Sequence, residues 1–411
     1  MTYNKAILPA AEGAEESFAA SEIFFSRTDR RGVIRAGNTV FRRVSGFEWD
    51  RLIGAPHRVV RHPDMPRAVF WLLWSTIQAG KPIAAFVKNQ SAQGRWYWVL
   101  AVVLPCADGY VSVRIKPSGA LFQQARALYA EVLAAEASLS PEKAAEVLVQ
   151  RLAGMGFPSY TDFAGRILEQ ELGLRDAAAG RGETIEARIL AGLGESLAAT
   201  GAKQSDLLQE FEALQSIPTN MRIIASRLEP SGGPVSAISD NYKFASGEIS
   251  RRPEAFAGDE ANLCLTMSAI LREGLFLSSI AKLLGEVQRF LQQEDNSRAP
   301  VDFAVEQRLF AEVADRCRAE AQETMLKAEV TCGLLNLSSS EIRRMMLGLD
   351  TIRVMGRVES GRLGPSGLGL SSAIDQLDLR HASIATLLQE LMDLSSAIRN
   401  GINAYQRLLP G

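Results

Sequence analysis

The stretch that begins at Gly54 concentrates side chains that could hold a charged, planar molecule. Arginine carries a permanently charged fork that suits phosphate. Tryptophan and tyrosine offer flat faces that can cover a ring, and an asparagine amide can donate to and accept from the edge of a heterocycle. Together these groups suit a cofactor that has both a phosphate and a planar ring. The candidate binding residues are Arg61, His62, Asp64, Trp74, Asn89 and Tyr97.

Positive charge is concentrated around these candidates. Residues 26–67 contain ten arginines and four acidic residues, whereas the whole chain has a formal charge of −2 from 45 basic and 47 acidic residues. The local excess favours phosphate binding, although an ordinary solvated surface has the same composition. The overall balance argues against a general nucleic-acid binder. Asp64 has a second interpretation as the cap of a helix whose start Pro63 and Pro66 would fix.

The elements that position these residues are expected to form an α+β domain over residues 21–118, after a flexible lead at 1–20. Short alternating apolar runs predict five strands, and Gly and Asp residues supply the turns between them. Apolar spacing also predicts two helices. A five-stranded antiparallel sheet with flanking helices is the expected architecture. The predicted strands are 23–29, 33–37, 83–89, 95–105 and 109–115, and the predicted helices are 38–45 and 66–79.

The rest of the chain predicts an all-α region. Residues 119–200 are interpreted as a helical connector, and residues 201–411 carry apolar residues in steps of three and four, which favours an antiparallel helical bundle or coiled coil. Segments that start at Thr219 and Asp350 resemble each other, and each runs into a Gly/Pro-containing turn. We therefore expect two helical hairpins with tips near 231–234 and 364–369.

Several classes of function are excluded or disfavoured by what the sequence lacks. The four cysteines lie far apart without a CxxC motif, and there are only three histidines, so neither a disulfide framework nor a metal site is expected. No phosphate-binding glycine loop or nucleophile elbow is present, so we expect no enzyme. The third histidine, His381, is expected on the surface of a helix.

No segment reads as a signal peptide or as a membrane span. The most apolar stretch, Leu263 to Leu284, is interrupted by Arg272, Glu273 and Lys282. A span needs about 20 nearly uncharged residues. We therefore expect a soluble, cytoplasmic protein that works without a membrane anchor.

The motif around the candidate residues closely resembles the PAS sensor domain of bacterial aerotaxis receptors. The resemblance covers about 100 residues and depends on several short runs in the order that this family has them. They are Pro56-His57, Val-Arg-His-Pro-Asp-Met-Pro at 60–66, Ala68-Val69-Phe70, Trp74, Val87-Lys88-Asn89 and Tyr97-Trp98-Val99, with Asn38 and Phe41 upstream.

In that family the PAS domain binds FAD non-covalently and reports redox state. The resemblance therefore implies FAD here, held by Asn38, Arg61, His62, Asp64, Trp74 and Asn89, with His57 and Tyr97 as further candidates. Two alternatives stay open. His62 could be a heme ligand, since some PAS domains bind heme, or the domain could hold another ligand or none.

The function that this resemblance implies is a cytoplasmic redox or oxygen sensor that signals through its helical region to a chemotaxis-like pathway. Implied partners are a chemotaxis histidine kinase or coupling protein, or other helical receptors, and a homodimer could form through the PAS domain or the bundle. Two alternatives are a PAS-gated interaction scaffold without kinase coupling, and a flavoenzyme. We expect a change in the sheet to pass through Lys116, Pro117 and Ser118 into the helix that follows.

Overall fold

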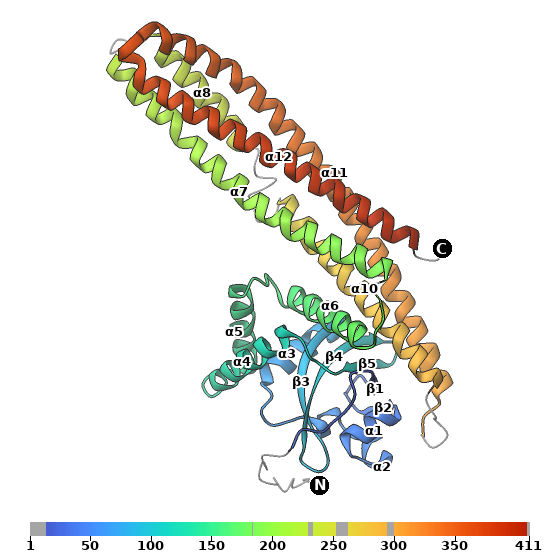
Figure 1. Ribbon diagram of the computed structural model, residues 1–411. Coiled ribbons are helices and arrows are strands. Elements are labelled where there is room, and N and C mark those ends of the chain that lie inside the picture. The colour runs from blue at the N-terminus through green and yellow to red at the C-terminus, as the bar shows by residue number, and fades with distance from the viewer. Residues whose placement is uncertain (1–13, 183, 229–232, 252–261, 294–299, 409–411) are drawn as a thin grey trace. The chain divides into compact units, whose positions relative to one another are not determined.

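The computed structural model describes residues 14–182, 184–228, 233–251, 262–293 and 300–408. The chain divides into two compact units (Figure 1). The first, called the sheet unit below, contains Met1–Glu183 and Arg272–Ala321. The second, called the helical unit, contains Thr184–Leu271 and Gln322–Gly411.

The sheet unit is built on five antiparallel strands in the spatial order β2-β1-β5-β4-β3. All five strands lie where the sequence predicts them, so the expected architecture is confirmed. Strands β5 and β4 are neighbours in the interior of the sheet and carry most of its buried Val and Leu residues. The strands are β1 Phe24–Asp29, β2 Ile34–Gly37, β3 Ile83–Gln90, β4 Trp96–Cys106 and β5 Gly109–Ile115.

Strand pleating gives the sheet two different faces, because successive side chains point to opposite sides. The register sets Ser26 opposite Ser112, and Ser112 opposite Val103, so these three residues share one face. Phe25 and Phe86 belong to the other face, where they meet aromatic residues from the helices that follow. The first face carries the candidate site, and the second face is packed against helices.

Short helices cover the first face. They are α1 Thr39–Ser45, α2 Trp49–Leu52, the 3₁₀ turn η1 His57–Val60 and α3 Arg67–Gln78. Asp64 does not cap α3, because the helix begins after Pro66 without a side-chain cap from its own segment. Instead the backbone N–H of Ala68 donates to Glu136 Oε1 at 2.6 Å. The interpretation of Asp64 as a helix cap is therefore wrong, and Glu136 has that role.

Helices also cover the second face of the sheet. α4 Ala120–Ala135 contributes Phe122, and α6 Tyr160–Ala178 contributes Phe163, both against Phe86. α5 Pro141–Gly154 lies between them in the chain, with Ser140 as its N-cap. The first part of α11 Phe303–Leu363 also belongs to this unit and brings Phe310 against Phe25.

Helix α10 Leu263–Gln293 is the one helix among the described residues that is long and apolar enough to cross a membrane. Half of its most apolar window is buried inside the protein. Its charged residues pair with α6: Arg272 with Asp162, Lys282 with Asp176, and Glu286 with Arg175. These contacts are those of a core helix, which is compatible with a soluble protein.

The helical unit consists of long helices that run antiparallel. α7 Ile185–Leu228 and α12 Leu368–Leu408 lie side by side along their length, as salt bridges from Lys203 to Glu390 and from Arg380 to Glu210 show. α8 Pro234–Arg251 returns alongside α7, where Ser239 Oγ donates to the Pro218 carbonyl. The sequence therefore correctly predicts long helices after the sheet.

The 3₁₀ turn η2 Gly364–Gly367 joins α11 to α12, and it falls within residues 364–369, where the second tip is expected. The first expected tip, near 231–234, lies partly outside the described residues. The boundary drawn at residue 200 falls inside the continuous helix α7. His381 is not on the surface: it is buried, its Nε2 meets the Tyr242 hydroxyl, and its Nδ1 lies 3.3 Å from Asp350 Oδ1.

Candidate functional site

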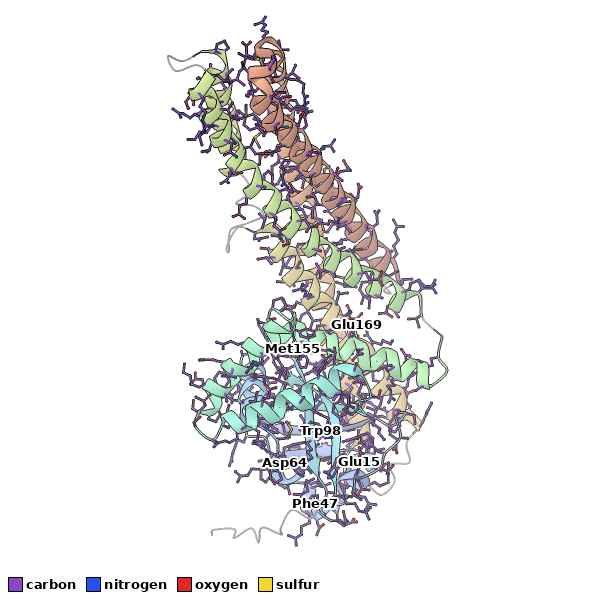
Figure 2. The ribbon with its side chains drawn as sticks, turned by 60° about the vertical axis from the view of Figure 1, so that its left-hand side comes forward. Glu15, Phe47, Asp64, Trp98, Met155 and Glu169 are labelled. Atoms are coloured by element: carbon purple, nitrogen blue, oxygen red, sulfur yellow. The ribbon has the colours of Figure 1, made fainter. Side chains whose placement is uncertain are left out.

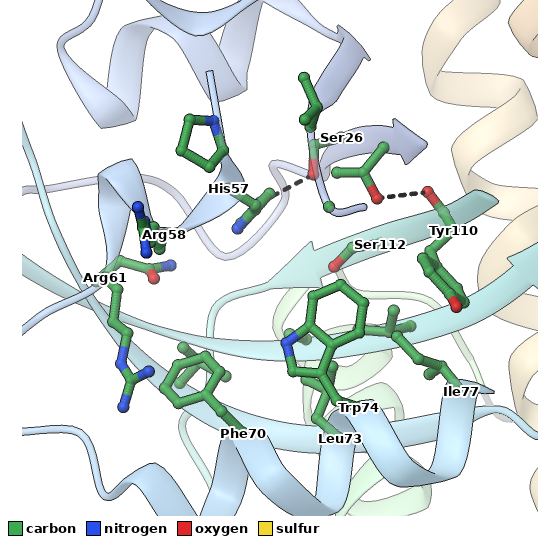
Figure 3. Close-up of a pocket in the computed structure, with 18 of the residues that line it drawn as sticks. Ser26, His57, Arg58, Arg61, Phe70, Leu73, Trp74, Ile77, Tyr110 and Ser112 are labelled. Carbon is green, nitrogen blue, oxygen red and sulfur yellow. Dashed lines mark hydrogen bonds between the residues drawn. The ribbon is translucent and has the colours of Figure 1, made fainter. Parts of the chain in front are cut away.

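A cavity of about 560 Å³ opens on the first face of the sheet. Its floor is formed by β1, β3, β4 and β5, and its walls by η1 and α3 (Figure 3). Ligand sites for small molecules usually measure about 300–1,000 Å³. The cavity is therefore large enough for a small organic molecule, and its wall is divided into an apolar side, a cationic mouth and a buried polar side.

The apolar side comes mainly from α3. Phe70, Leu73, Trp74 and Ile77 recur at helical spacing, so they share one face of the helix and border the cavity together (Figure 3). The Trp74 ring also meets Tyr110 edge to face, with centroids 5.5 Å apart. These rings can cover a planar ligand.

Gly32 lets the first turn of the sheet approach the Trp74 ring closely. Its φ is +75°, a left-handed conformation that glycine adopts readily. A Cβ at this position would lie 2.9 Å from Trp74 Cη2. The turn between β1 and β2 and helix α3 therefore fix the position of the indole from two sides.

Three arginines lie at the mouth of the cavity. Arg31 and Arg58 are exposed, and Arg61 is half-buried with its guanidinium 3.8 Å from the Phe70 ring centroid. Burial lowers the pKa of Arg61, although arginine stays charged in proteins. This arrangement offers positive charge to an anionic group that lies at the rim of the cavity.

The buried polar side is centred on Arg114 of β5, which is 3% exposed. Its Nη2 donates to Ser26 Oγ at 2.9 Å and lies 2.6 Å from His57 Nε2. Because a guanidinium has only donors, His57 Nε2 accepts, and the ring is neutral with its proton on Nδ1. Burial, and then the positive charge of Arg114, lower the pKa of His57 to about 3.

Three polar groups around the cavity have no hydrogen-bond partner among the residues that the structure describes. Arg114 Nη1 and Ser112 Oγ are buried without a hydrogen bond. Asn89 is 4% exposed, and its side-chain amide has no hydrogen-bond partner within the described part of the chain. Buried polar groups are almost always hydrogen-bonded in native proteins. Their concentration beside a cavity is typical of a site that is completed by a ligand.

Four of the eight residues predicted from the sequence line this cavity: His57, Arg61, Trp74 and Asn89. They come from η1, the following loop, α3 and β3. An isolated antiparallel bridge between Arg61 and Asn89 attaches the loop to the sheet. The structure therefore brings these four residues to one place although they are spread over more than thirty positions of the chain.

Asn38 and Tyr97 lie in the core beside the cavity and do not line it. Asn38 is the N-cap of α1, and its Oδ1 accepts from the backbone N–H groups of Phe41 and Phe25. Tyr97 is fully buried on β4 against Phe18 and Phe24, and burial raises the pKa of its hydroxyl. Both residues can act on a ligand only through their neighbours.

His62 and Asp64 turn away from the cavity lining into a small polar group of their own. His62 Nδ1 accepts from the Asp64 backbone N–H at 3.1 Å, and the His62 ring is buried. The carboxylate of Asp64, a residue labelled in Figure 2, forms a 2.7 Å ion pair with Lys88, and the Lys88 ammonium lowers the pKa of this carboxyl. Burial and the Lys88 charge lower the pKa of His62. This group holds the loop before α3 against β3.

Several lining residues were missed by the sequence analysis, above all Arg114, Ser112, Ser26 and Tyr110. They lie at alternate positions of β1 and β5, so they occupy the cavity face of strands that were otherwise identified correctly. The available signal was an arginine, Arg114, within the otherwise apolar second half of the strand Gly109–Ile115. A charged residue in such a strand indicates either an exposed edge or a functional interior.

The fold and site define a five-stranded α+β domain with a ligand-sized, partly cationic cavity, joined to long helices. No protein family model matches the chain. A 96-residue stretch is 41% identical to the aerotaxis receptor of Escherichia coli (strain K12). It covers 22% of this chain and 19% of that receptor, so the likeness concerns one segment of each protein. The chain therefore contains a region homologous to an aerotaxis receptor, as the motif predicts.

Proposed function

We propose that the sheet unit is an FAD-binding PAS domain and that the chain is a redox or oxygen sensor of the aerotaxis-receptor type. The observation that carries this proposal is the cavity itself, which combines an aromatic wall, buried unpaired polar groups and a mouth with three arginines. The homology of one segment to an aerotaxis receptor supports the sensor role.

The lining residues fit the chemistry of FAD. Phe70 and Trp74 would cover the ring system, and Asn89, Ser112 and Arg114 would supply hydrogen bonds to its polar edge. The arginines at the mouth would pair with the pyrophosphate. When bound, FAD accepts and donates electrons, and its charge and hydrogen-bonding pattern change with its oxidation state.

Strand β1 connects the cavity to helix α11. Ser26 lines the cavity, while its neighbours Phe25 and Arg27 lie on the opposite face of the strand. Phe25 packs against Phe310, and Arg27 forms a two-pronged ion pair with Glu306. We propose that a movement of β1 at Ser26, on the cavity face, also moves Phe25 and Arg27 on the opposite face. The change is then transmitted to α11, which continues into the helical unit. This route adds to the one expected through residues 116–118.

The partners of the helical unit would be chemotaxis signalling proteins, a histidine kinase or coupling protein, in the cytoplasm. The relative with 41% identity is a receptor, which supports a signalling role over an enzymatic one. Helix α11 also leaves apolar side chains exposed, among them Val330, Leu337 and Leu347, which favours helical partners. Co-purification with a chemotaxis kinase or coupling protein tests this proposal, and capture of other helical proteins alone would favour a scaffold.

Cavity variants test the cofactor proposal. Trp74→Ala removes the ring that covers the cavity, and Arg61→Ala removes one charge at its mouth, so both should purify with at least tenfold less FAD than the parent protein. The amount of FAD is measured after heat release, by absorption and by mass.

Trp71→Ala is the matched control, because Trp71 belongs to the same helix but is 40% exposed and does not line the cavity. It should keep its FAD. Equal FAD content in all three variants would contradict the proposed site, and folding of each variant is checked by its circular dichroism.

A further inference from the structure

Arg114 is a buried cation without a carboxylate partner. No ion pair to it is present within the residues that the structure describes, and its Nη2 contacts are the neutral groups Ser26 Oγ and His57 Nε2. The Phe24 and Phe41 rings lie 5.9 and 5.3 Å from its guanidinium carbon. Aromatic faces favour a nearby cation, but they do not neutralise it. An unpaired buried charge is costly, so this position calls for a compensating ligand.

The atoms left without a partner specify what that ligand offers. Arg114 Nη1 is a pure donor, and the Ser112 hydroxyl, two residues along the same face of β5, is a second possible donor. Both residues line the cavity floor. They match an acceptor edge with a carbonyl oxygen and a ring nitrogen, and a negative charge on that edge would be favoured further. A cationic ligand is excluded by the same charge.

The position within the cavity distinguishes this subsite from the arginines at the mouth. Arg31 and Arg58 are exposed, as suits a hydrated phosphate, whereas Arg114 and Ser112 are 3% and 8% exposed and sit in the sheet. The buried pair therefore suits the ring, and the exposed pair suits the phosphates.

We propose that Arg114 and Ser112 form the subsite that holds the acceptor edge of the flavin ring and that Arg114 favours binding of the reduced flavin. This inference rests on the proposed FAD site. Flavin that has gained two electrons and one proton carries one negative charge on its ring. A fixed cation at that edge binds this form more tightly than the neutral oxidised form, and so raises the reduction potential of the bound cofactor.

The test compares the parent protein with Arg114→Met, Arg114→Lys and Ser112→Ala. Riboflavin and FAD are titrated into flavin-free protein, and reduction potentials are measured against a reference dye with dithionite as the reductant. Arg114→Met should weaken the binding of riboflavin and the binding of FAD by the same factor of at least ten. It should also weaken the binding of reduced flavin tenfold more than the binding of oxidised flavin. For a two-electron couple this difference lowers the reduction potential by about 30 mV.

The variants separate a tuning role from a structural one. Arg114→Lys keeps the charge, so its potential should stay closer to the parent value than that of Arg114→Met, even if affinity falls. Ser112→Ala removes only a hydroxyl, so it tests the subsite even if Arg114→Met does not fold. This variant should weaken the binding of riboflavin and of FAD equally. Loss of FAD affinity without loss of riboflavin affinity would assign Arg114 to the phosphates and overturn the proposal.

Two failures are distinguishable. A parent protein that binds neither flavin would overturn the FAD site and this inference with it. A parent protein that binds FAD, with variants of unchanged affinity and potential, would overturn only the role of Arg114 and Ser112.

Discussion

The Asn38 amide connects three backbone groups in the core of the sheet unit. It accepts from Phe25 N–H and Phe41 N–H and donates to the Ile23 carbonyl at 3.1 Å. We predict that Asn38→Ala lowers the free energy of unfolding by about 2 kcal/mol, since it removes a helix cap and leaves buried backbone groups without partners. All five tryptophans lie in the sheet unit, so denaturant unfolding followed by tryptophan fluorescence reports on it.

Asn89→Ala is the matched control for Asn38→Ala. The Asn89 amide has no hydrogen-bond partner among the described residues, so its removal should leave stability nearly unchanged and reduce FAD content instead. The opposite pattern, with Asn38→Ala stable but depleted of FAD, would show that Asn38 is a ligand contact and not a structural residue.

His57 makes the sheet unit sensitive to acid. Its pKa is about 3 in the folded protein and near 6.5 when the chain unfolds. Below pH 6.5 the unfolded chain therefore binds a proton that the folded protein does not, and stability falls as the pH falls toward 3. We predict that, as the pH falls through this range, the free energy of unfolding of the parent protein decreases by up to about 1.4 kcal/mol per pH unit more than that of His57→Gln. Parallel pH profiles of the two proteins would contradict the neutral His57.

Sequence reasoning at the residue scale found side chains with suitable chemistry but not their directions. Trp74 and Asn89 could be predicted because ring faces and amides are chemically distinctive, and both line the cavity. Asn38 belongs to the same motif, yet it caps a helix. Arg114 was missed because the strand pairing that brings it beside Ser26 and His57 joins segments distant in the chain.

At the scale of elements, the contact of β1 with α11 connects the cavity face to a long helix. Arg27 Nε lies 3.0 Å and Nη2 2.7 Å from Glu306 Oε1, and the Glu306 side chain is only 2% exposed. We predict that Arg27→Met lowers the free energy of unfolding by about 3 kcal/mol, because it leaves the buried Glu306 carboxylate unpaired. Hydrogen exchange of the β1 amides should speed up accordingly.

The double variant Arg27→Met/Glu306→Leu tests the cause. Removal of both charges should restore most of the protection of the β1 amides from hydrogen exchange, since apolar residues can replace a buried ion pair at little cost in stability. If the single and double variants exchange equally fast, the ion pair does not hold α11 against the sheet and the proposed route through β1 fails.

The sequence predicts where the long helices lie in the chain more easily than it predicts which helices pack against each other. Apolar spacing of three and four residues identifies α7, α10 and α12, because any packed helix needs such a face. Spacing does not state which partner covers that face. The salt bridges between α10 and α6, such as Lys282 with Asp176, join residues that are more than a hundred positions apart.

At the scale of the whole molecule, the chain combines a cavity-bearing sheet unit with a unit of long helices, and both units contain parts of α10 and α11. One segment is homologous to an aerotaxis receptor, and it spans 19% of that receptor. The two shared helices therefore give the continuous chain that the proposed route from the cavity to the helical unit requires.

An absorption spectrum of the purified full chain, recorded before and after FAD addition and after reduction with dithionite, tests the cofactor site most directly. We expect the visible bands of oxidised flavin, about one FAD per chain on heat release, and bleaching of those bands on reduction. A protein that stays colourless after incubation with excess FAD and removal of unbound cofactor would contradict the proposed sensor.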